Sequence, residues 1–199
     1  MIERTAEQAL EILKRGNEAF VADRSQTVPV DRHRRLELAR GQTPFAILVG
    51  CSDSRVPPEI LFGRGLGDLF IVRIAGNTVG QAALGSIEYA VAQLDVPLIV
   101  VLGHERCGAV EAAVRIVEEN ATFPGAIGDM VAPIIPAVLR VRAQPGDLVS
   151  NAVHENVRRV VTRLKASGPI LAERLAAGRL RIVGAFYDLD EGVVEFFDD

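Results

Sequence analysis

Two short segments hold the only two cysteines of this 199-residue chain. They are GCSDSRV (50–56), which contains Cys51, and GHERCG (103–108), which contains His104 and Cys107. Two thiolates and one imidazole form a ligand set that favours Zn²⁺. Three protein ligands leave the fourth tetrahedral position open, which is typical of catalytic rather than structural zinc sites. We therefore interpret these three residues as the ligands of a catalytic zinc ion.

Asp53 and Arg55 lie beside the first of these cysteines and suit a supporting role. An ionised aspartate can accept the remaining hydrogen bond of a zinc-bound hydroxide and so orient its lone pair. A neighbouring guanidinium keeps the carboxylate ionised, best through a bidentate contact. We therefore predict that Asp53 and Arg55 pair as a catalytic dyad. His33 and His154 lie in charged helical stretches, and we expect both to be ordinary surface residues.

The sequence pattern around these motifs predicts an α/β fold that positions them. Continuous apolar runs predict strands buried on both faces, as in a parallel sheet; they cover 45–50, 69–74, 97–103 and 179–187. Helical patterns alternate with these strands; they cover 80–94, 108–119 and 151–165. The run 193–197 follows a turn and predicts an antiparallel edge strand. We expect a mostly parallel sheet of about four parallel strands plus one antiparallel edge strand, with helices on both faces.

Both motifs follow strands in this scheme. Cys51 comes directly after the first strand, and His104 and Cys107 follow the third. Ligands of open α/β sheets bind outside the carboxyl ends of the strands, where the strand order reverses. We therefore expect the two segments to face each other across one crevice.

The rest of the chain predicts one domain over 1–199. A capping box at Thr5 opens an amphipathic helix over 5–23. Its apolar stripe exceeds what a small sheet needs, so we expect it to pack on a partner subunit. A shorter helix is expected over 32–40, and the segment 121–149, rich in proline and glycine, is expected to be the least regular.

Composition narrows the class of protein. The net charge of −4 argues against nucleic-acid binding, which needs charge that neutralises phosphate. No apolar run approaches the ~20 residues that span a bilayer. The N-terminal residues lack the apolar region of a secretory signal, so we expect a cytoplasmic protein with reduced thiols.

These residues resemble the β-class carbonic anhydrases. The motif CSDSR, followed about fifty residues later by GHERCG, is similar to the signature of that family. Further segments resemble it in the same order; they are GDLFIVRIAGN, GSIEYAV, VPLIVVLGHERCGAV and IVGAFYDLDEG. The resemblance implies reversible, zinc-dependent hydration of CO₂ to bicarbonate and a proton. It also implies a homodimer as the building block, often assembled into tetramers or larger oligomers.

The resemblance assigns further roles by position. It implies that Gly108 offers its backbone N–H to a bound anion, and that Val56 and Tyr89 line a small apolar CO₂ pocket near the dimer interface. Some bacterial relatives carry a tryptophan that helps to form a second bicarbonate site, and Leu48 takes its place here. We therefore expect bicarbonate to be a poor allosteric inhibitor.

Two other interpretations remain open at this point. Hydrolases of carbonyl sulfide or carbon disulfide resemble the same family, and the motifs alone do not separate their substrates from CO₂. A non-enzymatic zinc or redox module would instead have a closed site or a disulfide between Cys51 and Cys107.

Overall fold

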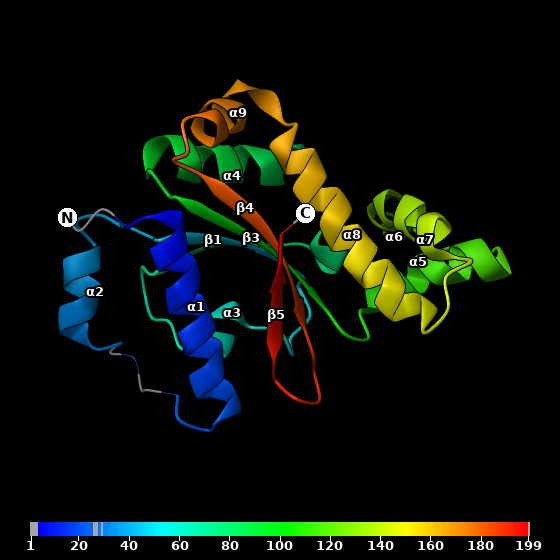
Figure 1. The fold of residues 1–199 in the computed structure, drawn as a ribbon, viewed down its shortest axis with the longest axis horizontal. Helices are drawn as coiled ribbons and strands as arrows, with labels where there is room; N and C mark the ends of the chain where they lie inside the picture. The colour runs from blue at the N-terminus through cyan, green and yellow to red at the C-terminus, as the bar shows by residue number, and fades with distance from the viewer. Residues whose placement is uncertain (1–3, 26–27, 29, 199) are drawn as a thin grey trace.

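The computed structural model describes residues 4–25, 28 and 30–198 (Figure 1). Within these residues one sheet has the strand order β2-β1-β3-β4-β5. The strands are β1 (Ala46–Gly50), β2 (Leu69–Arg73), β3 (Leu98–His104), β4 (Arg181–Tyr187) and β5 (Val194–Phe197). The pairs from β2 to β4 are parallel, and β5 pairs with β4 in antiparallel orientation. The predicted fold class is therefore confirmed.

The strand order reverses between β1 and β3. The chain passes from β1 to β2 on one side and then crosses back to form β3 on the other side of β1. The register pairs Gly50 with Leu102, so Cys51 and His104 leave neighbouring strands at almost the same level. All the residues of β1 and β3 are buried. The two motifs thus lie at the topological switch point, where open α/β sheets bind their ligands.

Helices cover both faces of the sheet. The α-helices are α1 (Ala6–Val21), α2 (Arg32–Leu38), α3 (Pro58–Leu61), α4 (Gln81–Gln93), α5 (Gly108–Glu119), α6 (Ile127–Val131), α7 (Ile135–Val141), α8 (Leu148–Lys165) and α9 (Gly168–Ala176). Short 3₁₀ helices occur at η1 (Ala75–Asn77) and η2 (Ala132–Ile134). Helices α1 and α3 pack on one face, and α4, α8 and α9 pack on the other. Helices α5, α6 and α7 gather beside α8 on the right of Figure 1.

The segment 121–149 is more regular than the sequence suggested. It forms α6, η2 and α7 and then enters α8, whose N-cap Asp147 accepts a hydrogen bond from the Ser150 N–H. Two of its four prolines, Pro133 and Pro136, lie in the first turns of η2 and α7. A proline there removes no hydrogen bond, because the first N–H groups of a helix have no intrahelical partner. Helix α9 was also absent from the sequence prediction.

Helix α1 has the predicted capping box at Thr5, but the reason for placing it on a partner is not upheld. Its stripe, which includes Leu10 and Leu13, is buried within its own chain against β1, β3 and α3. The expectation that α1 also contacts a partner subunit stays a prediction. One buried polar residue of the helix is Asn17, which donates to the Gly192 carbonyl (2.9 Å) and accepts from the Val194 N–H (2.8 Å). The first helix is thereby tied to the last hairpin.

Candidate metal centre

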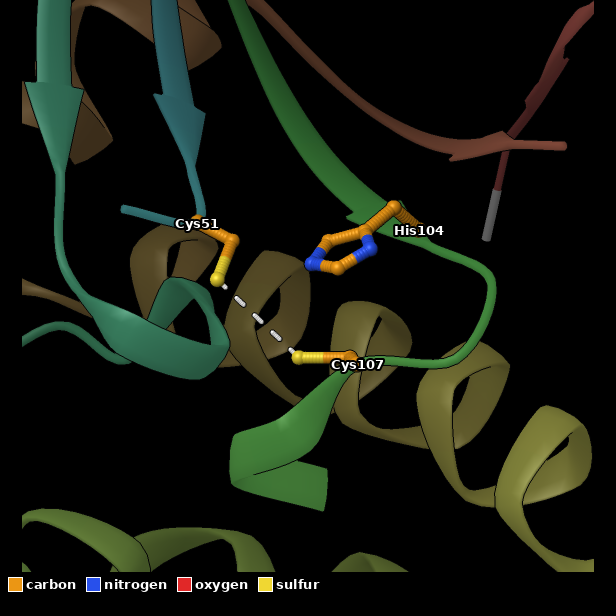
Figure 2. A group of neighbouring side chains, drawn as sticks. All are labelled: Cys51, His104 and Cys107. Atoms are coloured by element: carbon orange, nitrogen blue, oxygen red, sulfur yellow. Dashed lines mark hydrogen bonds between the residues drawn. The ribbon is translucent and has the colours of Figure 1, made fainter. Parts of the chain in front are cut away.

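Three buried side chains converge at the end of the sheet, and we call them the ligand cluster: Cys51, His104 and Cys107. Cys51 follows β1, His104 is the last residue of β3, and Cys107 is the N-cap of α5. Figure 2 shows the three side chains pointing toward one another. Their ligand atoms all lie within 4.8 Å of one another, and the two Sγ atoms are 4.0 Å apart. Two Zn–S bonds of about 2.3 Å at a tetrahedral angle place the sulfurs about 3.8 Å apart, so the cluster fits Zn²⁺.

The imidazole of His104 is prepared to act as a ligand. Its Nδ1 lies 2.9 Å from the carbonyl oxygen of Glu105, which fixes the tautomer with the proton on Nδ1. The lone pair of Nε2 is then free. This atom is fully buried, and among the described residues it has no hydrogen-bond partner. A buried polar atom without a partner is rare and calls for an explanation, and a metal ion supplies one.

The two thiols contact each other directly, and this contact affects their pKa values in opposite directions. The hydrogen bond with Cys107 lowers the pKa of Cys51, and the same contact raises the pKa of Cys107. The Gly76 N–H donates to the Cys51 sulfur at 3.3 Å and further favours the thiolate. Gly76 has φ +66, a left-handed conformation that favours glycine, and a Cβ there would lie 2.6 Å from Ile134 Cδ1. A metal cation bound between the two sulfurs would favour the thiolate form of both.

Asp53 and Arg55 pair as the sequence predicted. Arg55 Nε donates to Asp53 Oδ1 (3.0 Å), and Nη2 donates to Oδ2 (2.8 Å). The Arg55 backbone N–H adds a third bond to Oδ1 at 2.9 Å. These hydrogen bonds hold the pKa of Asp53 well below its usual range. Oδ2 lies 3.9 Å from His104 Nε2, so the carboxylate borders the cluster while it stays paired with Arg55.

Arg73 braces this loop, a role that sequence reasoning missed. It ends β2, and the register places it beside Gly50. Its Nε donates to the Cys51 carbonyl (2.8 Å), and its Nη2 donates to the Asp53 carbonyl (2.5 Å). An arginine that ends a strand next to the motif strand was the available signal, but it becomes meaningful only once β1 and β2 are known to be neighbours.

The three substrate-binding residues expected from the resemblance have different surroundings. Val56 is buried and packs with α1 and α3. Gly108 opens α5 directly after Cys107, and the first N–H groups of a helix have no intrahelical partner. Tyr89 lies on α4, where half of its side chain is exposed and its ring contacts Phe70. None of the contacts described for Tyr89 joins it to the ligand cluster, so a single chain does not bring it to the site.

A second set of potential ligands lies close by, and we call it the carboxylate group: Glu105, Asp188 and Asp190. It joins the loop after β3 to the turn between β4 and β5. Arg106 donates to both oxygens of Asp190 and also contacts Glu105 at 3.3 Å. The carboxylates are partly or fully exposed, and each accepts hydrogen bonds from the protein.

Comparison with known proteins gives the family. A model described as carbonic anhydrase matches residues 46–194. The chain is 46% identical over 184 residues to "Carbonic anhydrase 2" of Mycobacterium tuberculosis, covering 92% of this chain and 89% of that relative. It is 43% identical over 187 residues to "Carbonic anhydrase" of Mycolicibacterium smegmatis, covering 94% of this chain and 91% of that relative.

Solved structures agree with this match. The β-carbonic anhydrase CcaA has a TM-score of 0.76 at 27% identity and covers 96% of this chain and 94% of its own. One of two tetrameric β-carbonic anhydrases from Sordaria macrospora has a TM-score of 0.77 at 26% identity, covering 93% and 94%. The chain belongs to the β-class carbonic anhydrase family, so it is an enzyme.

In the described part of the chain, no helix is both long and apolar enough to cross a membrane.

Proposed function

We propose that the protein catalyses the reversible hydration of CO₂ to bicarbonate and a proton, with Zn²⁺ held by the ligand cluster. The observation that carries the proposal is the buried Nε2 of His104, which has no hydrogen-bond partner among the described residues and lies beside two thiols at zinc-compatible spacing. When bound, Zn²⁺ acts as a Lewis acid that makes water a nucleophile near neutral pH. Three protein ligands leave a coordination position open for that chemistry.

Asp53 orients the reacting water. Its carboxylate stays ionised because Arg55 donates three hydrogen bonds to it. An ionised carboxylate only accepts hydrogen bonds, so it holds the water's remaining O–H and directs the oxygen lone pair toward the substrate. Arg55 itself does not titrate in the working pH range. The dyad therefore keeps a fixed acceptor beside the ligand cluster.

Val56 and Gly108 would serve the substrate. The buried, apolar side chain of Val56 offers a wall that suits linear, uncharged CO₂. The N-terminus of α5 carries a partial positive charge, and the Gly108 N–H there would bind the anionic product.

The active form would be a homodimer or a multiple of one. The related S. macrospora enzymes are described as tetrameric. Tyr89 would complete the CO₂ pocket only across a subunit interface, since within one chain its ring packs on Phe70. Size-exclusion chromatography with light scattering tests this assembly, and a fully active monomer would contradict it. The cytoplasmic location also stays a prediction.

The test of the reaction is CO₂ hydration by the purified protein, followed by stopped flow, with zinc content measured on the same sample. We expect one zinc ion per chain and rapid turnover of CO₂. Carbonyl sulfide is assayed in parallel, because it is a linear molecule that would fit the same site. Faster turnover of carbonyl sulfide than of CO₂ would contradict the proposed substrate, and a zinc-free active enzyme would contradict the proposed centre.

A further inference from the structure

The loop that joins two members of the ligand cluster has an unusual backbone. It runs from His104 to Cys107 through Glu105 and Arg106. The backbone of Arg106 has φ +50, a left-handed conformation that residues other than glycine rarely adopt. Such residues gather at functional sites and persist only where the surrounding structure holds them. The question is what holds Arg106.

The side chain of Arg106 is held by the turn between β4 and β5. Nη1 donates to Asp190 Oδ2 (3.0 Å), and Nη2 donates to Asp190 Oδ1 (2.6 Å). This two-point contact fixes the guanidinium plane as well as its position. It also lowers the pKa of Asp190. The two residues are 84 positions apart in the sequence, so the contact joins two separate parts of the fold.

Asp190 itself lies on a well-anchored turn. Asp188 Oδ1 accepts the N–H groups of Asp190 (2.8 Å) and Glu191 (2.9 Å), which closes the turn locally. Asn17 of α1 then holds the hairpin at Gly192, in the connection between the strands, and at Val194, the first residue of β5. The carboxylate that receives Arg106 is therefore a fixed point.

The backbone of Arg106 passes this constraint to the dyad. Its carbonyl accepts a hydrogen bond from Arg55 Nη2 at 3.2 Å. The same Nη2 donates to Asp53 Oδ2 at 2.8 Å. Arg55 is half exposed, so without this second acceptor its guanidinium could swing away with the carboxylate it holds. A continuous set of contacts thus joins Asp190 to Asp53.

We propose that Asp190 is a positioning residue: by clamping Arg106 it fixes both the backbone that carries Cys107 and the carbonyl that orients Arg55 on Asp53. The side-chain contacts described for Asp190 are with Arg106, not with the ligand cluster. Its effect on turnover rests on the proposed function, whereas its effect on the loop of Cys107 does not.

The test is the variant Asp190→Asn, which keeps the size of the side chain and removes its charge. We expect kcat for CO₂ hydration to fall roughly 10-fold with little change in KM, and zinc transfer to a chromogenic chelator to become faster by a similar factor, as for other residues that support metal ligands. Thermal unfolding should stay unchanged, because exposed ion pairs contribute little to stability.

A matched control lies at the opposite end of the same hairpin. Arg181 Nη2 donates to Asp198 at 2.6 Å, and this pair has exposure similar to that of Arg106 and Asp190. Asp198→Asn should therefore keep the wild-type kcat and zinc-transfer rate. An equal loss in Asp198→Asn would show a general weakening of the hairpin and overturn the proposal.

A double-mutant cycle with Arg106→Gln tests the path of the effect. If Asp190 acts through Arg106, the double variant should be no worse than the more impaired single variant. Effects that multiply, or wild-type kcat and zinc transfer in Asp190→Asn, would overturn the proposal. If the wild-type protein binds zinc but does not hydrate CO₂, the proposed reaction fails, and zinc transfer still tests the clamp.

Discussion

The ligand cluster and the carboxylate group lie a few residues apart, and each brings three potential metal ligands together. The ligand cluster is buried and contains an imidazole nitrogen with no partner among the described residues. The carboxylate group is partly exposed, and Arg106 and backbone N–H groups already bind its oxygens. Both groups therefore bring three potential ligand atoms close together, but of these described residues only those of the ligand cluster include an atom that is free to bind a metal ion.

This difference indicates that one group can bind a metal ion and the other supports the structure around it. A buried nitrogen lone pair without a hydrogen-bond partner is stabilised strongly by a bound cation, since no water competes for it. A carboxylate that already accepts from a guanidinium would have to give up that contact first. The ligand cluster is thus suited to hold the metal, and the carboxylate group is suited to hold the loop between the ligands. The following changes test this contrast.

The largest effect is expected from Cys107→Ser. A residue that supports a ligand is worth about 10- to 100-fold in metal affinity, so loss of a ligand itself should weaken zinc binding by more than this and abolish most activity. Elemental analysis of the dialysed protein measures the zinc. His33→Gln, on the exposed surface of α2, is the control and should keep full zinc. A Cys107→Ser variant with one tightly bound zinc would refute the ligand assignment.

Asp53→Asn should separate chemistry from metal binding. The amide keeps the shape of the side chain but donates where the carboxylate accepts, so we expect kcat to fall by roughly 10²- to 10⁴-fold, the usual range for a group that handles protons. Zinc content should stay at one per chain. Stopped-flow assays and metal analysis on the same sample measure both. Loss of zinc together with activity would mean that Asp53 supports the metal itself.

The sequence placed His154 among ordinary surface residues, but the structure half-buries its ring between aromatic side chains, so it tests whether burial alone makes a histidine a ligand. Its ring stacks on Phe186 (4.2 Å between centroids) and also contacts Phe197. Burial lowers its pKa, Arg158 lowers it further, and Glu195 opposes them. The unfolded chain then binds more protons below the ordinary pKa of about 6.5. The free energy of unfolding should therefore decrease as the pH falls through 6.5, until the pH passes the folded pKa.

Replacing His154 by Phe removes this titration. Urea unfolding at a series of pH values between 7 and 5 should show a flatter profile for His154→Phe than for the wild type, with unchanged zinc content. His33→Gln is the control and should keep the wild-type slope. A wild-type slope in His154→Phe would show that the ring is not the titrating group.

The smallest effect on zinc content is expected from neutralising the two members of the carboxylate group that border the clamp. Glu105→Gln combined with Asp188→Asn should leave zinc at one per chain, because neither residue belongs to the ligand cluster. Titration calorimetry of the wild type with Ca²⁺ or Mn²⁺ should show no saturable binding. A calcium-dependent heat that disappears in the double variant would make the carboxylate group a second metal site.

The sequence predicted most of what is local. Each strand shows as an apolar run, and the ligands stand directly at strand ends, so the ligand cluster and the pairing of Asp53 with Arg55 could be inferred. Contacts that depend on strand neighbours could not. Arg73 supports the Cys51 loop only because β2 lies beside β1, and Asp190 reaches Arg106 across 84 residues. Periodicity carries no information about such distant pairs.

The prolines of 121–149 concealed helices for a different reason. Proline is disfavoured inside a helix but suits its first turn, and composition alone does not distinguish these positions.

Tyr89 shows a further limit of prediction from the sequence. Its expected role depends on a second subunit, which the periodicity of one chain does not describe.

The hydrogen bonds of Asn17 affect when, during synthesis, the folded contacts of the first helix can form. A ribosome releases α1 early, but the buried amide of Asn17 finds partners in Gly192 and Val194, 175 and 177 residues further along the chain. Asp190 emerges in the same late stretch. The loop that carries Cys107 therefore gains its clamp only when the last hairpin has left the ribosome and docked on α1. We expect the nascent chain to hold zinc weakly until that moment and firmly after it.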